Sequence, residues 1–116
     1  MAKGAFLGEF EYIVMLSLLR MGEDAYGMTI RLDIELRTGR PVAVGAVYAA
    51  LDRLEEKSYI TSREGETTRG RGSRSKTYFK ITKSGLHALR ETHMIFRRME
   101  RGTETRLGPA MRTSRA

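Results

Sequence analysis

The sequence predicts a mainly α-helical domain that carries one small β-hairpin. Two observations predict this fold class: apolar residues recur every three or four positions along several segments, and two short segments are rich in β-branched and aromatic residues. The chain has 116 residues, so we expect a single domain with a thin core. We see no internal repeat that would indicate another architecture.

The first helix is expected from about Gly8 to Met21, where the apolar residues follow the helical period. Gly22 is placed to end it, because a glycine commonly follows the last turn of a helix. Three residues are expected to form its buried stripe: Ile13, Leu16 and Leu19.

The second helix is expected from about Ala25 to Thr38, with Asp24 as its N-terminal cap and Gly39 at its end. Its apolar pattern is mixed. Gly27 either leaves room for a close helix crossing or simply weakens the first turn. A short connector that contains proline and valine follows the helix and is expected to be extended, Arg40–Val44.

The third helix is expected from about Gly45 to Lys57. One of its faces is apolar and suits a core: Val47, Ala50, Leu51 and Leu54. The opposite face has small residues in its first half and acids in its second: Gly45, Ala49, Asp52 and Glu56. Tyr48 and Arg53 flank this outer face. The small residues indicate that something outside the domain comes very close to the helix.

A β-hairpin is expected next, with strands in Tyr59–Glu66 and Ser75–Thr82. A glycine-punctuated basic loop, Thr67–Arg74, forms its tip. The segment from Thr61 to Lys83 has seven cations and two acids, which gives it +5 of the net charge of +7. The positive charge of the chain is therefore concentrated in the hairpin.

A long fourth helix is expected from about Lys83 to Gly102, with Thr82 as its cap. A small domain already closed by three helices cannot bury the apolar stripe of this helix, so we expect the stripe to mediate dimerisation. The stripe consists of Leu86, Leu89, His93, Phe96 and Met99. The tail, Thr103–Ala116, has no helical or strand period, and we expect it to be mobile.

Composition limits the function classes. The absence of cysteine excludes disulfides and thiolate chemistry and favours a reducing compartment. The apolar run Tyr12–Leu19 is too short to span a bilayer, and the acids before it disfavour a signal peptide. We therefore expect a cytoplasmic protein without a membrane partner. The sequence pI of about 10.1 predicts a polyanionic partner, with nucleic acid as the first choice.

Enzymatic chemistry has little support in the sequence. His87 and His93 are six positions apart, which does not place them on one helix face as metal ligands at i and i+4 would be. No nucleophile stands beside a base, and the Gly-Arg-Gly run is not a phosphate-binding loop. We predict no catalytic residue, no metal and no cofactor.

The order of elements describes a winged helix-turn-helix followed by a dimerisation helix. In such a motif the recognition helix enters the major groove, which is about 12 Å wide and admits only a slim leading face. Tyr48 can offer its hydroxyl to a phosphate or a base edge. The residues expected to contact double-stranded DNA are Gly45, Ala46, Tyr48, Ala49, Arg53, Arg69, Arg71, Arg74 and Lys76.

Each of these features also has a plainer interpretation. The third helix could be an ordinary surface helix, and the basic loop could be a solvated tip or an Arg-Gly segment that binds RNA. The main alternative function is a winged-helix module for protein association that does not bind DNA. Binding to an anionic membrane is a weaker third choice, because the fourth helix also carries acids.

The sequence resembles the PadR-like family of transcriptional regulators. The resemblance covers about residues 8–100, and four segments carry it: Tyr26–Ile30, Val44–Ile60, Tyr78–Thr82 and Thr82–Leu89. It implies a homodimeric winged-helix repressor whose last helix packs against the other subunit. It also implies that Tyr48 faces DNA, and that Arg74 and Lys76 contact the DNA backbone.

The chain departs from the usual family pattern at four positions: Ala46, Ala49, Ser58 and Phe79. Ala46 removes a hydroxyl that could meet a phosphate, and Ser58 ends a helix less readily than glycine does. By resemblance, a small aromatic effector is also expected, with four residues as its contacts: Phe10, Tyr12, Met94 and Phe96. We thus expect a DNA-binding domain over residues 1–82, a dimerisation helix over 83–102 and a tail over 103–116. The expected operator is an inverted repeat.

Overall fold

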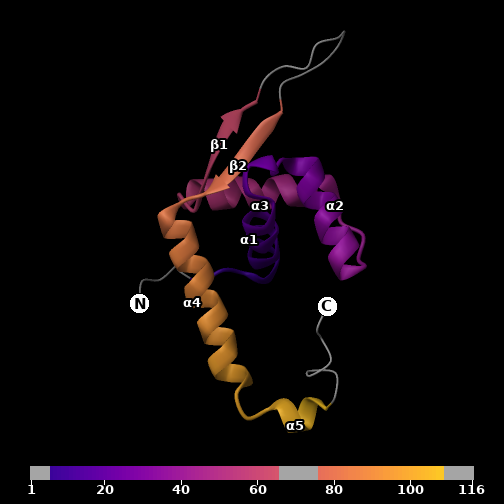
Figure 1. Cartoon of the computed structure of the whole chain (residues 1–116), viewed down its shortest axis with the longest axis vertical. Helices are drawn as coiled ribbons and strands as arrows, with labels where there is room; N and C mark the ends of the chain where they lie inside the picture. Colours follow the sequence, from indigo (N-terminus) through magenta and orange to yellow (C-terminus); the bar gives the residue numbers. More distant parts are fainter. Residues whose placement is uncertain (1–5, 66–75, 109–116) are drawn as a thin grey trace.

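The computed structural model describes residues 6–65 and 76–108 (Figure 1). Helices dominate, and one antiparallel pair of strands forms the hairpin, which confirms the predicted fold class. In chain order the elements are α1 (Glu9–Met21), the 3-10 helix η1 (Gly22–Asp24), α2 (Gly27–Thr38), α3 (Val44–Glu56), β1 (Ile60–Glu64), β2 (Thr77–Ile81), α4 (Lys83–Glu100) and α5 (Glu104–Leu107).

The core lies where α1, α2 and α3 meet, and Phe79 of β2 closes one side of it. Ile30 and Ile34 point into the core from α2. The apolar face predicted for the third helix is confirmed, because all four of its residues are fully buried: Val47, Ala50, Leu51 and Leu54. Burial of this face leaves the small residues of α3 outside.

The buried stripe predicted for α1 was wrong. Leu16 and Leu19 are 37% and 52% exposed, whereas Val14, Met15 and Leu18 are buried. The core-facing row of α1 follows positions 11, 14, 15 and 18, and its first member is an acid. That acid interrupts the apolar pattern, so the continuous row of apolar residues on the neighbouring face gave the stronger periodicity.

The acid in this row is Glu11, which is buried and ion-paired. Its carboxylate accepts a hydrogen bond from Arg53 Nε at 2.9 Å and one from Lys57 Nζ at 3.1 Å. Burial raises the pKa of Glu11, but the hydrogen bonds and charges of the two cations outweigh it, so its pKa lies below the ordinary value. The pair of contacts joins the C-terminal half of α3 to α1.

A second buried polar contact joins α1 to α2. The Ser17 hydroxyl donates to Asp33 Oδ2 at 2.8 Å, and Arg37 Nε lies 2.9 Å from Asp33 Oδ1. Burial raises the pKa of Asp33, but these hydrogen bonds and the charges of Arg20 and Arg37 lower it further than burial raises it. α1 is thus connected to α2 and to α3 by one ionised carboxylate each.

The helix ends agree with the sequence except at one cap. Gly22 and Gly39 end α1 and α2 with positive φ, and the Gly39 N–H donates to Glu35 O. Asp24 was predicted to cap α2, but it lies in η1 instead. The cap is made by Thr29, whose hydroxyl oxygen accepts from the Tyr26 N–H at 3.0 Å and donates to backbone oxygen. The helix therefore begins later than predicted, at Gly27.

The turn from α3 into β1 contains Ser58 in the left-handed conformation, with φ of 66°. The Ser58 N–H donates to Glu55 O, and the Tyr59 N–H donates to Leu54 O. These two bonds form a Schellman motif, in which glycine is the usual residue at the Ser58 position. The Ser58 carbonyl accepts from two hydroxyls at the start of α4, so the turn is held in place from both sides.

The hairpin pairs β1 with β2 from Ile60↔Ile81 to Glu64↔Thr77. Thr82 caps α4 as predicted, because its hydroxyl oxygen accepts from the Gly85 N–H at 3.0 Å. A Cβ on Gly85 would overlap the Tyr59 carbonyl. The first turn of α4 therefore packs directly against the backbone that leads into the hairpin.

The rest of α4 extends away from the hairpin (Figure 1). Its buried residues include Ala88 and Thr92, and the Thr92 hydroxyl accepts from the Leu7 N–H at 2.9 Å. A short helix, α5, lies in the tail, where we had expected no regular structure. The remainder of the tail, 109–116, lies outside the described residues, as does the hairpin tip.

Ser58→Gly is expected to stabilise the protein by about 0.5–1 kcal/mol. Glycine adopts positive φ without the steric cost of a Cβ, and this gain exceeds the extra chain entropy that glycine has when unfolded. The measurement is the free energy of unfolding in urea, with an unchanged slope. Ser58→Ala keeps the Cβ and should change little; a stabilisation of equal size in both variants would contradict the explanation.

Glu11→Gln is expected to destabilise the protein by about 1–2 kcal/mol at neutral pH, since the two cations lose a charged acceptor but remain partly solvated. Because the folded-state pKa of Glu11 is lowered, its stabilisation is complete above the unfolded pKa and is lost as the pH falls through the folded one. The difference between wild type and variant should thus shrink below about pH 4. The measurement is the free energy of unfolding in urea. If the difference between wild type and variant stayed constant from pH 7 to pH 3, the charge of Glu11 would not contribute to stability.

Candidate nucleic-acid interface

The start of α3 forms an open edge of small residues. Gly45, Ala46 and Ala49 are all exposed, and a Cβ built on Gly45 would meet no atom within 4 Å. No side chain of the described part of the chain covers this edge at Gly45. The predicted slim face is therefore accessible to a partner from outside.

Tyr48 lies beside this edge and is 43% exposed. Its ring packs on Gly27, the first residue of α2. Arg53, which we had also placed among the DNA contacts, lies in the second half of α3. It donates its Nε–H to Glu11. Its guanidinium is thus already paired within the domain.

The acids of α3 are confined to its second half. Asp52, Glu55 and Glu56 are exposed, and Glu55 accepts a hydrogen bond from the Ser62 hydroxyl at 2.8 Å. The first turns of the helix have no acid at all. Of the two ends of α3, only the N-terminal end is suited to approach a polyanion.

Two tyrosines join the loop end of the hairpin strands to the start of α2. The rings of Tyr26 and Tyr78 meet edge to face with centroids 5.4 Å apart, and the two residues also pair as an isolated β-bridge. Lys76 Nζ lies 5.1 Å from the centre of the Tyr26 ring, and Arg63 Cζ lies 4.7 Å from that of Tyr78. Cation–π contacts of this kind restrict where the two charges lie.

Arg63 is a basic residue of the hairpin that sequence reasoning counted but did not assign. Its position opposite Tyr78 in the register was the available indication, because facing residues of a hairpin are neighbours. Lys76 is exposed directly before β2, and its predicted contact with the DNA backbone stays a prediction. The three other predicted contacts of the hairpin, Arg69, Arg71 and Arg74, lie outside the described residues.

A second surface, the α1–α4 face, is apolar, and no other described segment covers it. Its centre is a groove of about 240 Å³ between α1 and α4. The groove is lined by Tyr12, Leu16, Leu19, Leu86, Leu89, Arg90 and His93. Further along α4, Met94, Phe96 and Met99 are also exposed, and the Phe96 ring packs on Tyr12 of the groove.

The residues predicted for dimerisation do not all lie on this face in the same way. His93 is exposed, and its Nδ1 lies 3.5 Å from the Tyr12 hydroxyl. Leu86 is half-buried. Leu89 is only 4% exposed and belongs to the core, but it also lines the groove, so its role in dimerisation stays a prediction. Leu89 faces inward beside Ala88, and both side chains pack against the domain.

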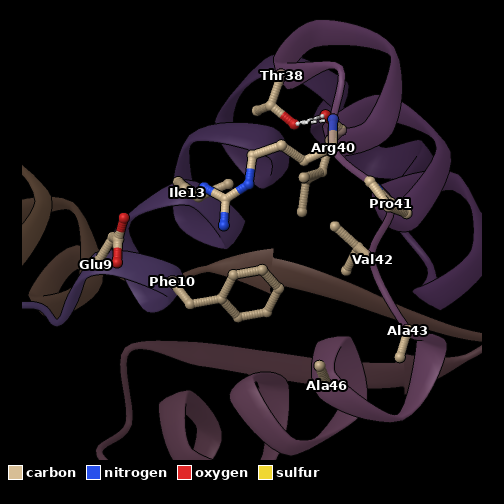
Figure 2. A pocket seen from close by; sticks show the side chains of 10 residues that line it. Glu9, Phe10, Ile13, Thr38, Arg40, Pro41, Val42, Ala43 and Ala46 are labelled. Carbon is tan, nitrogen blue, oxygen red and sulfur yellow. Dashed lines mark hydrogen bonds between the residues drawn. The ribbon is translucent and has the colours of Figure 1, made fainter.

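The residues predicted to contact an effector are divided between two sites. Tyr12 and Phe96 pack together, with ring centroids 5.9 Å apart, and Phe96 also packs on Phe6. Phe10 lies on the other side of α1 and lines a separate pocket of about 320 Å³ (Figure 2). In that pocket Arg40 extends across the space above Phe10. The role of Phe10, Tyr12, Met94 and Phe96 in binding an effector stays a prediction.

Two further searches concern metals and membranes. Among the described residues, no three His, Asp or Glu side chains gather closely enough to hold a metal ion. Within residues 6–65 and 76–108, no helix has both the length and the apolar character needed to cross a membrane.

Three short helices, a two-stranded hairpin and an open recognition edge define a winged helix-turn-helix protein. A family model described as the transcriptional regulator PadR-like family matches residues 15–91. The chain belongs to this PadR-like family of transcriptional regulators. No curated protein matches the chain.

Solved structures agree with this assignment. A transcriptional regulator from Clostridium thermocellum is 28% identical over 78% of this chain and 84% of its own, with a TM-score of 0.65. A PadR family regulator from Clostridium difficile R20291 is 24% identical over 86% of this chain and all of its own (100%), with a TM-score of 0.69. Bacillus subtilis PadR, solved in complex with operator DNA, is 25% identical over 71% of this chain and 46% of its own, with a TM-score of 0.57.

Proposed function

We propose that this chain is a homodimeric transcriptional repressor that binds an inverted-repeat operator through the start of α3 and the hairpin. The observation that carries the proposal is the open edge of Gly45, Ala46 and Ala49 in a chain of the PadR-like family. A helix with this edge leading fits the width of the major groove. The operator complex of Bacillus subtilis PadR supports the same class of partner.

The hairpin supplies the charge that such a complex needs. Lys76 and Arg63 lie at the loop end of its strands, close to the start of α2, and are restricted by their tyrosine partners. Phosphate contacts of this kind set position and affinity, whereas contacts with base edges set sequence preference. The hairpin therefore holds the DNA backbone while α3 reads the groove.

The α1–α4 face supports the dimer. Apolar side chains that protrude from both helices, together with a nearly apolar groove, are the features of a surface that is covered in its working state. A two-fold pair joined there would present two recognition helices. Half-sites about 34–36 Å apart, one turn of DNA, would then match the two helices.

Duplex DNA binding should weaken steeply with salt. Roughly six phosphate contacts give a slope of about −5 for the logarithm of affinity against the logarithm of salt concentration. Lys76→Ala should reduce the size of that slope by about 1. Arg101→Ala removes the same charge beyond the end of α4 that lies far from the hairpin, and it should leave the slope unchanged (Figure 1).

The measurement is a titration of a fragment from the promoter of the chain's own gene, at several salt concentrations. Absence of binding even at low salt would contradict the proposed function. A salt-insensitive complex with a protein, without DNA retention, would instead support the alternative of a protein-association module.

Leu19→Glu is expected to convert the dimer into monomers, because it places a charge in the apolar groove. Leu19 is already about half exposed, so the fold should be retained. Leu36→Glu is the matched control, since Leu36 is 82% exposed on α2 and lies outside the groove. Sedimentation equilibrium at micromolar concentrations measures both. A monomeric wild type, or a Leu19→Glu variant that remains dimeric, would show that this face is not the dimer interface.

A further inference from the structure

Gly27 is a glycine because of what covers it. Its backbone does not have the positive φ that favours glycine, in contrast to Gly22 and Gly39. A Cβ at this position would overlap the hydroxyl and ring carbons of Tyr48. The absence of a side chain, rather than backbone freedom, is therefore what the structure requires at Gly27.

Packing, and not hydrogen bonding, sets the position of the Tyr48 ring. Within the described part of the chain, the Tyr48 hydroxyl has no hydrogen-bond partner. One side of the ring lies against Gly27, while 43% of the residue faces solvent. The hydroxyl is thus free for an external partner, and its place depends on how closely the ring approaches α2.

The same short segment also positions the hairpin. Tyr26, next to Gly27, pairs with Tyr78 by its backbone and by its ring. The Phe79 N–H donates to Ala25 O at 2.9 Å, one residue earlier. The start of α2 therefore contacts both Tyr48 of α3 and the β2 strand of the hairpin, and it fixes the positions of both.

We infer that Gly27 is a positioning residue for DNA recognition, which acts by holding the Tyr48 ring against the start of α2. A side chain at position 27 would push the ring outward into the space where the duplex approaches. The inference rests on the proposed function, because it needs Tyr48 to meet DNA. It adds a residue that does not itself touch the DNA.

The test is a double-mutant cycle of wild type, Gly27→Ala, Tyr48→Ala and the double variant. Gly27→Ala should weaken operator binding about tenfold, the loss of one well-placed contact. In the Tyr48→Ala background the same change should have no further effect, because the ring is gone. The unfolding midpoint of Gly27→Ala should not fall, since alanine favours a helix more than glycine does and an exposed ring can move aside.

Two controls separate positioning from a general effect of the substitution. Gly8→Ala also places a methyl group at the start of a helix, but a Cβ there meets no atom within 4 Å, so operator affinity should be unchanged. Tyr48→Phe keeps the ring and removes the hydroxyl, so its loss should match that of Gly27→Ala if the hydroxyl makes the contact. If Gly27→Ala does lower the midpoint, affinity is measured where circular dichroism shows each variant to be folded.

The outcomes are distinct. Operator affinity that is unaltered in Gly27→Ala, or a loss of equal size with and without Tyr48, would overturn the inference and leave the proposed function intact. Failure of the wild type to bind any duplex at low salt would overturn both. A loss that appears only when Tyr48 is present supports the positioning role.

Discussion

Burial of one face of α3 is the constraint on which the rest of the structure depends. Val47 and Leu51 fill the space between α1 and α2, and they prevent rotation of α3 about its own axis. The small residues of the opposite face must then point outward. The Schellman turn at Ser58 leads the chain straight from this helix into β1, so helix and hairpin keep one relative orientation.

Two buried or half-buried carboxylates each pair with two cations of the helices. Arg53 and Lys57 are paired with Glu11, and Arg20 and Arg37 with Asp33, so these four charges are largely compensated within the helices. Both carboxylates have lowered pKa values and therefore stay ionised well into the acid range. Arg63 and Lys76, at the loop end of the hairpin strands, form no ion pair with another described residue, and an anionic partner is proposed to bind there.

The sequence predicted what depends on local rules and missed what depends on side chains from distant positions. The helix order, the hairpin, the buried face of α3 and the Thr82 cap all follow from periodicity and capping. The burial of Glu11 could not be foreseen, because its partners are more than forty positions away, with 42 to Arg53 and 46 to Lys57. The packing of Tyr48 on Gly27 was also missed, because these residues too are distant in the sequence. The packing of Leu89 into the core of its own domain was not predicted, because an apolar stripe does not show which of its members face inward.

Leu89 separates two environments, since it belongs to the core and also lines the groove of the α1–α4 face. Truncation at this position would open a void on both sides at once. A screen for monomeric variants would then find substitutions of Leu89 because they destabilise the fold, and not because they only break the dimer. If two copies associate through this groove, association stabilises the folded state. The melting temperature then rises with protein concentration.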